Sequence, residues 1–260
     1  MSAPFEPDST VVAEVAPSPN HNERPDGQAP DILLLHYTGM PTAAEALERL
    51  RDPAAAVSCH YFVHEDGRVV QMVPEGRRAW HAGLSSWERV PDVNARSIGV
   101  EIVNPGHAGG LPPYPAAQIA KVIELSLDVI RRWGIRPDRV LGHSDVAPER
   151  KEDPGELFPW ERLHRAGAGH WVEPAPIRER RVCAIGETGE PVRALQARLA
   201  SYGYGIPVSG AFDQATAAVV RAFQRHFRPA RVDGIVDPST LETLANLIAA
   251  RPAGFQVTKS

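Results

Sequence analysis

Cysteine, long apolar runs and an excess of positive charge are scarce or missing in this chain. Only two of its 260 residues are cysteines, Cys59 and Cys183. They fall in different predicted domains, so a disulfide framework is not expected. No stretch approaches the roughly 18 to 20 apolar residues of a transmembrane helix. The formal net charge of −4 argues against a general nucleic-acid binder, which usually carries a basic face. The length suits one sizeable core and a small second domain.

The N-terminal 30 residues are expected to form an extended segment. Residues 1–30 are rich in Pro, Glu, Asp and Asn. They contain neither a basic region followed by an apolar region, as in a secretory signal peptide, nor a lipobox cysteine. We therefore expect a cytoplasmic protein. A true start site upstream of Met1 would instead allow a periplasmic location.

Two histidines and one carboxylate stand at positions that suit a metal ion. His36 ends the apolar run "ILLL", His143 follows the stretch "RVLG", and Asp153 lies in a nearby loop rich in proline and charge. Two imidazoles and a carboxylate suit Zn²⁺ and leave its fourth position open for water, as in catalytic zinc sites. Spacing alone leaves open the alternative that these residues bind no metal, because the chain has ten histidines and most histidines are ordinary surface or core residues.

Apolar periodicity predicts alternating strands and helices over residues 31–173. A capping box at Thr42–Glu45 opens a short helix. The clearest helix begins at Pro115 and ends at Gly134. Strands interleaved with helices imply an α/β domain with a central mixed β-sheet flanked by helices. The best-marked strands are a hairpin of 59–64 with 69–73 and the strand 97–103.

A second, helical region follows a linker of proline and charge at residues 174–181. Over residues 182–250, apolar positions at helical spacing predict a small three-helix domain. Residues 251–260 are assigned as a tail. The three helices are expected to begin near Thr188, Asp213 and Asp237.

Several separated sequence words carry a resemblance to a known family. The words "LLLHYT", "GVEI" and "GHSDVAPERKEDPG" resemble the zinc-dependent N-acetylmuramoyl-L-alanine amidases of the type 2 amidase family, and most closely its peptidoglycan-recycling and envelope branch. The resemblance covers roughly residues 30–173. It implies an amidase and peptidoglycan-recognition type of fold. It also implies one Zn²⁺ per chain, held by His36, His143 and Asp153.

The C-terminal region resembles a small three-helix peptidoglycan-binding domain. The words that carry this resemblance are "GETGEPVRALQARLASYGY", "SGAFDQATAAVVRAFQRHF" and "VDGIVDPSTLETL". Fold alone does not establish binding. The alternative is a region that only packs against the catalytic domain.

Two charged residues are candidates for catalysis. Glu101 is the single acidic residue in the apolar word "SIGVEIV". A carboxylate near the attacking water could take its proton, while the alternative is a solvent-facing residue on an edge strand. Lys151 precedes Asp153 by two residues, so an extended loop would place both side chains on one side. Its alternative is a solvated lysine. The resemblance implies that Glu101 and Lys151 are catalytic.

Other polar residues are assigned to substrate binding. The word "WHAG" resembles the cleft-lining word of the family, and its histidine contacts either substrate or only a structural partner. An arginine before the strand 97–103 pairs with a substrate carboxylate or caps a loop. His60 is interpreted as a core histidine, and the other six histidines carry no supporting word. The predicted substrate-binding residues are Trp80, His81, Asn104, Tyr37, Ser144 and Arg96.

Together these features predict hydrolysis of the amide between N-acetylmuramic or anhydro-muramic acid and L-alanine of the peptidoglycan stem peptide. The expected partners are muropeptides, with intact cell wall as a further candidate through the C-terminal domain. No nucleic acid and no membrane span are expected. Two alternatives stay open. A non-catalytic peptidoglycan-recognition protein usually lacks a metal ligand, and a zinc peptidase cutting within the stem peptide would differ in its products.

Overall fold

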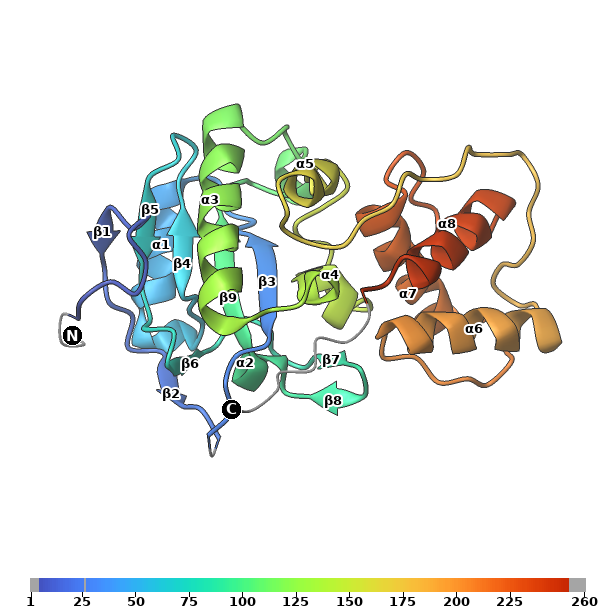
Figure 1. Ribbon diagram of the computed structural model, residues 1–260, viewed down its shortest axis with the longest axis horizontal. Helices are drawn as coiled ribbons and strands as arrows, with labels where there is room; N and C mark the ends of the chain where they lie inside the picture. The colour runs from blue at the N-terminus through green and yellow to red at the C-terminus, as the bar shows by residue number, and fades with distance from the viewer. Residues whose placement is uncertain (1–4, 26, 253–260) are drawn as a thin grey trace.

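A six-stranded mixed sheet forms the centre of the larger half of the molecule (Figure 1). The computed structural model describes residues 5–25 and 27–252. All neighbouring strands are parallel except one antiparallel hairpin, so the expected α/β class with a mixed sheet is confirmed. The strand order is β1 (Glu14–Val15), β5 (Val69–Gln71), β4 (Tyr61–Val63), β9 (Ser97–Ile102), β3 (Ile32–Tyr37) and β10 (Val140–Gly142).

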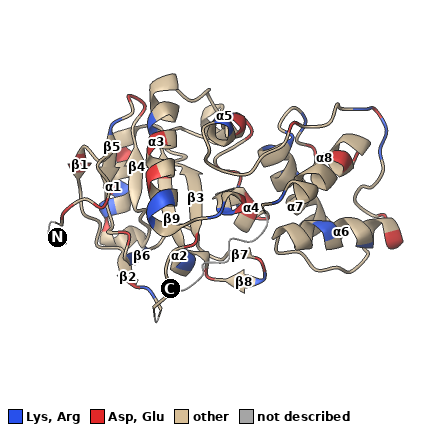
Figure 2. Ribbon diagram, viewed as in Figure 1, with Lys and Arg blue, Asp and Glu red and all other residues tan. Residues whose placement is uncertain are grey.

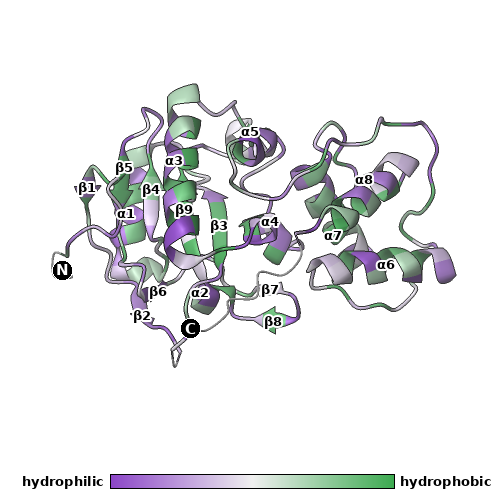
Figure 3. Cartoon of the chain, viewed as in Figure 1, coloured by the Kyte–Doolittle hydropathy of each residue, from purple (hydrophilic) through white to green (hydrophobic). Residues whose placement is uncertain are grey.

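Helices cover both faces of the sheet. Helix α3 (Ala116–Trp133) packs its apolar stripe on the face that carries Leu35. Helix α1 (Ala43–Arg51) packs with Phe62 on the opposite face. Side chains alternate along a strand, so His36 points to the α1 side when Leu35 points to the α3 side. Figure 3 shows hydrophobic residues concentrated on β3, as a strand covered on both faces requires.

Local sequence signals account for the ends of these helices. The Thr42 hydroxyl accepts a hydrogen bond from the Glu45 amide and donates to the Glu45 carboxylate, so Thr42 is the N-cap of α1, as the predicted capping box requires. Helix α3 ends at Gly134, whose φ of 66° lies in the left-handed region that glycine adopts without strain. The observed strands β4, β5 and β9 are shorter than predicted, because regular pairing stops before the ends of the apolar runs.

Short elements connect the main ones and shape the site. Two small two-stranded sheets and several short helices lie outside the main sheet in the larger half (Figure 1). They are β2 (His21–Glu23) with β6 (Arg77–Ala79), β7 (Ser86–Trp87) with β8 (Val90–Pro91), α2 (Val93–Arg96), α4 (His143–Val146), α5 (Trp160–Arg165) and the 3₁₀ turns Pro53–Ala55, His107–Gly109 and Pro137–Arg139.

The described part of the N-terminal segment is built into the larger half. Strand β1 pairs with β5 at the edge of the sheet, and β2 pairs with β6. The Arg24 guanidinium reaches inward and donates to the carbonyl oxygens of Glu75, Ala95 and Ser97. The segment expected to be extended is therefore extended in these two strands, and an inserted side chain ties it to the catalytic half.

Three helices form the C-terminal region: α6 (Glu190–Tyr202), α7 (Gln214–Phe227) and α8 (Pro238–Ala249). Asp213 and Asp237 cap α7 and α8 through their carboxylates, as predicted. The cap expected near Thr188 is wrong by one residue. Gly189 is the N-cap of α6, because the backbone of Thr188 is paired with Ala211 in an isolated β-bridge.

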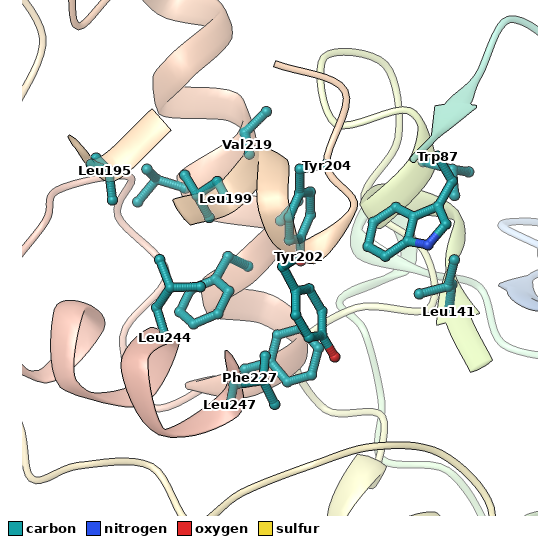
Figure 4. Packing of buried hydrophobic residues seen from close by; sticks show 14 of the residues in the cluster. Trp87, Leu141, Leu195, Leu199, Tyr202, Tyr204, Val219, Phe227, Leu244 and Leu247 are labelled. Carbon is teal, nitrogen blue, oxygen red and sulfur yellow. The ribbon is translucent and has the colours of Figure 1, made fainter. Parts of the chain in front are cut away.

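One hydrophobic cluster joins the two halves (Figure 4). It combines Leu141 of the sheet with Leu199 of the C-terminal helices. Trp87 is fully buried at the junction, and its ring lies 5.2 Å from that of Tyr204, centroid to centroid. A Cβ atom at position 203 would come within 2.4 Å of the indole, so the close approach requires Gly203. The two halves therefore share a core rather than only a linker.

Charge is mixed over the surface of the molecule. Figure 2 shows residues of both signs along α3, where Lys121 pairs with Glu124 and Arg132 pairs with Asp128. Within the described residues, no helix has both the length and the apolarity that crossing a bilayer would take.

Candidate active site

A cavity of about 320 Å³ opens on the α1 side of the sheet. It lies at the carboxyl ends of β3 and β9 and at the start of α4, where open α/β sheets commonly bind ligands. The three predicted metal ligands and both predicted catalytic residues line it. These are His36, His143, Asp153, Glu101 and Lys151.

Strand register brings the first ligand and the predicted catalytic acid together. In the parallel β3–β9 pair, His36 is directly opposite Glu101. Neighbours in register project to the same face of a sheet. Both side chains therefore enter the cavity from adjacent strands, and the apolar residues beside them fill the cores on the two faces.

The other two ligands follow the last strand of the sheet. His143 is the first residue of α4, directly after β10, and Asp153 returns to it through the loop. The Nδ1 atoms of His36 and His143 lie 2.9 Å apart, and each lies 3.0 Å from Oδ2 of Asp153. All three side chains are buried. Two imidazole nitrogens and one carboxylate oxygen thus converge on a single point, the geometry of a small metal site.

The second nitrogen of each imidazole is held by a partner. Nε2 of His143 donates to the carbonyl oxygen of Ala82 at 3.0 Å. Nε2 of His36 contacts Nδ1 of His81 at 3.1 Å and carries the ring proton in the tautomer whose Nδ1 faces a metal; the other nitrogen of His81 lies 3.3 Å from the Ser97 hydroxyl. Each Nδ1 is then free of a proton and available to a metal, as outer-shell partners commonly arrange.

The protonation states also fit a metal. Burial and the neighbouring His143 lower the pKa of His36 to about 4, so its ring is neutral at physiological pH. Burial alone would raise the pKa of Asp153, but the charge and hydrogen bonds of His143 and His36 hold it well below its usual range. Neutral imidazole and ionised carboxylate are the forms that bind Zn²⁺. The residues present therefore fit a zinc ion with an open fourth position.

Glu101 and Lys151 have the properties that acid–base work requires. Burial and then the nearby Asp153 carboxylate raise the pKa of Glu101 well above its usual value, while Lys151 opposes the shift. The Oε2 atom of Glu101 is buried and has no hydrogen-bond partner among the described residues. A carboxylate without a donor, facing a polar cavity, is available to a proton of a bound water.

Three of the predicted substrate-binding residues line the cavity: Tyr37, Trp80 and His81. The Tyr37 hydroxyl contacts Nδ1 of His107 at 3.0 Å. The Trp80 indole donates to Asn22 of the N-terminal segment. His81 both lines the cavity and supports His36, so its structural hydrogen bond is established and a contact with substrate stays a prediction.

The other three do not line the cavity. Arg96 forms a two-point ion pair with Asp31 at 2.6 and 3.0 Å, which is the loop-capping alternative. The amide of Asn104 donates to the carbonyl of Pro112. Ser144 is 2% exposed. Arg96 and Asn104 thus have structural partners, and a contact of these three residues with substrate stays a prediction.

Some residues of the site were not anticipated. Helix α1 contributes Arg49 and Leu50 to the cavity wall, and neither residue was assigned to the site from the sequence. His107 supports Tyr37, and no sequence word marks it. His60 is a core histidine, as expected, because its Nδ1 accepts from the Gly99 amide and its Nε2 contacts the carbonyl of Arg77.

Fold and site together define an α/β protein with a candidate metal site that opens on a cavity. Residues 26–156 match the N-acetylmuramoyl-L-alanine amidase family, and residues 188–244 match the putative peptidoglycan binding domain. The chain belongs to the N-acetylmuramoyl-L-alanine amidase family. This confirms the resemblance drawn from the sequence.

Two characterised relatives illustrate the relationship. The chain is 36% identical over 222 residues to the N-acetylmuramoyl-L-alanine amidase AmiD of Escherichia coli (strain K12), which covers 80% of this chain and 79% of that protein. It is 36% identical over 171 residues to the 1,6-anhydro-N-acetylmuramyl-L-alanine amidase AmpD of Enterobacter cloacae, which covers 59% of this chain and 89% of that protein.

Solved structures share the arrangement of both halves. The E. coli AmiD complex with anhydro-N-acetylmuramic acid-L-Ala-D-γ-Glu-L-Lys superposes with a TM-score of 0.72 at 34% identity, covering 87% of this chain and 92% of that chain. AmpDh3 of Pseudomonas aeruginosa, in complex with anhydromuramic pentapeptide, gives a TM-score of 0.72 at 32% identity, covering 88% and 95%. The expected fold is confirmed over most of the chain.

Proposed function

We propose that this amidase hydrolyses the bond between anhydro-N-acetylmuramic or N-acetylmuramic acid and L-alanine of the stem peptide, with one zinc ion held by His36, His143 and Asp153. The convergence of these buried donors with Glu101 and Lys151 on one cavity carries the proposal. The family is zinc-dependent in general. Relatives that form complexes with anhydromuramyl peptides support this substrate class.

The side chains around the cavity then have distinct roles. When bound, zinc would acidify water and polarise the substrate carbonyl. Glu101 would accept a proton from the attacking water and deliver it to the departing amine of L-alanine. Its raised pKa suits a group that must both take and return a proton near neutral pH. The Lys151 ammonium would stabilise the negative oxygen of the tetrahedral carbon.

Soluble anhydro-muropeptides are the proposed principal substrates, as part of cell-wall recycling. The cavity of about 320 Å³ is open enough for a sugar lactyl group and the first residues of a peptide. Binding of intact cell wall is a separate proposal, supported only by the match of residues 188–244 to a putative peptidoglycan binding domain. A cytoplasmic location also stays a prediction, and cell fractionation with a tagged full-length gene would test it.

The two alternatives differ from this proposal in chemistry. A pure recognition protein needs no metal, whereas the ligands and Glu101 are all present and converge. A zinc peptidase would use the same metal chemistry on a different bond. Only the position of cleavage separates the amidase from the peptidase.

The test is mass spectrometry of products from a defined anhydro-muropeptide and from a cross-linked wall digest. Each reaction is run with the protein as purified, after chelation, and after zinc is restored. The expected result is free stem peptide plus intact anhydro-sugar, lost on chelation and recovered with zinc. A cut within the peptide would replace the amidase with a peptidase, and binding without any product would favour a recognition protein.

A further inference from the structure

The segment that carries two of the three metal ligands is contacted at both ends by the C-terminal region. Residues 142–156 contain His143 and Asp153, and the amide of Ser144 donates to the carbonyl of Asp153 at 3.0 Å. Helix α4, which begins with His143, packs against α7 of the C-terminal region. The ladder of the sheet ends at Gly142, so this segment has no strand neighbours of its own.

At the His143 end, Asp145 is the point of attachment. Its carboxylate is 1% exposed and accepts three hydrogen bonds. One comes from the Gly142 amide at 2.8 Å, within the same turn. The other two come from the C-terminal region, from the Tyr204 hydroxyl and Nδ1 of His226, each at 2.7 Å. A buried carboxylate that lost these two donors would carry an uncompensated charge.

The His226 side chain is itself held in place. It is 3% exposed, and its ring stacks on that of Trp160 with centroids 3.7 Å apart and planes at 22°. Trp160 belongs to α5 of the catalytic half, so His226 is inserted between two elements of that half. The donor that meets Asp145 is therefore rigid and cannot be replaced by a simple side-chain rotation.

At the Asp153 end, an arginine of α7 performs the equivalent task. Arg225 donates to Glu152 at 2.7 Å and lies 3.6 Å from Glu156. Glu152 stands between Lys151 and Asp153, the predicted oxyanion stabiliser and the third metal ligand. Only 8% of the Arg225 side chain is exposed, whereas 52% of the Glu152 side chain is, so this ion pair is desolvated on the arginine side.

We infer that the C-terminal region is a working part of the metal site, in which Tyr204, Arg225 and His226 position the segment that carries His143 and Asp153. The three are positioning residues, because they act through Asp145 and Glu152 and line no part of the cavity. This role is distinct from binding peptidoglycan. It rests on the proposed zinc site, and it predicts that changes at positions 51 to 83 residues away in sequence from the ligands His143 and Asp153 alter metal affinity.

A matched pair of variants in the full-length protein tests the inference. His226→Asn keeps an N–H donor near the position of Nδ1, whereas His226→Leu has the same size without a donor. Both lose the ring that stacks on Trp160. Zinc affinity is measured by competition with a chromophoric chelator, the Co²⁺-substituted protein gives a spectrum of ligand geometry, and the Tm of metal-free protein reports folding.

His226→Leu is expected to bind zinc about tenfold more weakly than wild type, the lower end of the 10- to 100-fold cost of outer-shell changes. Its Co²⁺ spectrum should shift, while His226→Asn should recover most of the affinity and the wild-type spectrum. Tyr204→Phe removes only one hydroxyl and should weaken zinc binding in the same direction. It keeps the test decisive if His226→Leu fails to fold.

Arg251→Met is the control for general docking. Arg251 also crosses between the halves, to Asp138 and Glu88, but neither partner lies in residues 142–156. It should lower the Tm and leave zinc affinity unchanged. Equal zinc affinity in the Leu and Asn variants, or an equal loss in Arg251→Met, would overturn the inference while wild type still binds zinc. A wild type that binds no zinc would instead remove the proposed function and this inference together.

Discussion

The two sides of the metal site are supported in different ways. His36 stands within a strand that has hydrogen-bonded neighbours on both sides, β9 and β10. His143 and Asp153 stand on the segment after the last strand, and the C-terminal region contacts this segment through Glu152 and Asp145. A ligand inside a sheet is positioned by the ladder, whereas a ligand on a loop depends on side chains that arrive from elsewhere.

The strand side also has a second layer of support, from the other end of the chain. His81 contacts Nε2 of His36, and its backbone amide donates to the side chain of Asn94. The carbonyl of Asn94 accepts in turn from Arg24 of the N-terminal segment. Residues from both ends of the chain thus support the site from opposite sides, and neither set lies within the family words that reveal the ligands.

Loss of a metal ligand should have the largest effect on zinc binding, and the effect should be the same on the strand side and on the loop side. Asp153→Ala on the loop side and His36→Ala on the strand side are both expected to abolish stoichiometric zinc binding, because two ligands seldom hold zinc. Metal content after dialysis against dilute zinc, with turnover of an anhydro-muropeptide, provides the measurement. Full occupancy in Asp153→Ala would show that another residue is the third ligand.

Glu101→Gln should separate catalysis from metal binding on the strand side. The amide cannot take a proton, so turnover is expected to fall by about 10²- to 10⁴-fold, the usual contribution of general acid–base catalysis. Zinc content should stay at the wild-type level. Glu65→Gln, the same change at an exposed position of the β4–β5 turn, is the control. A wild-type rate in Glu101→Gln would remove this residue from the mechanism.

His81 gives a direct comparison with His226 across the site. His81→Leu removes the acceptor that holds Nε2 of His36, and zinc affinity should fall by about 10- to 100-fold. His81→Asn keeps an acceptor near Nδ1 and should recover part of it. The loss in His81→Leu should exceed that in His226→Leu, because His81 touches a ligand directly whereas His226 acts through Asp145. The reverse order would contradict the comparison.

The smallest expected effect is on the pH dependence of the free energy of unfolding, through the core histidine His60. Burial, followed by the charge of Arg24, lowers the pKa of His60 to about 3. At acidic pH the unfolded chain therefore binds a proton at His60 that the folded chain does not bind. The stability contributed by neutral His60 is present above about pH 6.5 and is lost as pH falls towards 3. Between pH 7.5 and 5.5 the loss is about 1.4 kcal/mol.

Replacing His60 by Asn removes this proton uptake. Denaturant unfolding at the two pH values should then show a smaller difference for His60→Asn than for wild type, even though the variant is less stable overall. An unchanged pH difference would mean that other buried histidines, such as His36, dominate the acid sensitivity of the fold.

Much of the fold and of the candidate site could be predicted from local sequence because the residues concerned lie in short sequence motifs. Thr42, Asp213 and Asp237 mark helix starts through side-chain hydrogen bonds that span only a few residues. The apolar runs before His36 and His143 marked strands in the same way. Arg96 and Asn104 were assigned to substrate because nothing nearby in sequence announces their partners, Asp31 and Pro112.

The sequence by itself determined the α/β class and the two regions, and it predicted the candidate ligands His36, His143 and Asp153 and the pair Glu101 and Lys151, which the fold brings to one cavity. These depend on residue type, periodicity and short words. Only the tertiary structure decided that His81 and Asp145 support the ligands, and that the C-terminal region shares a core with the catalytic half. Such contacts join residues tens of positions apart, and whether a donor finds its acceptor depends on how whole elements pack.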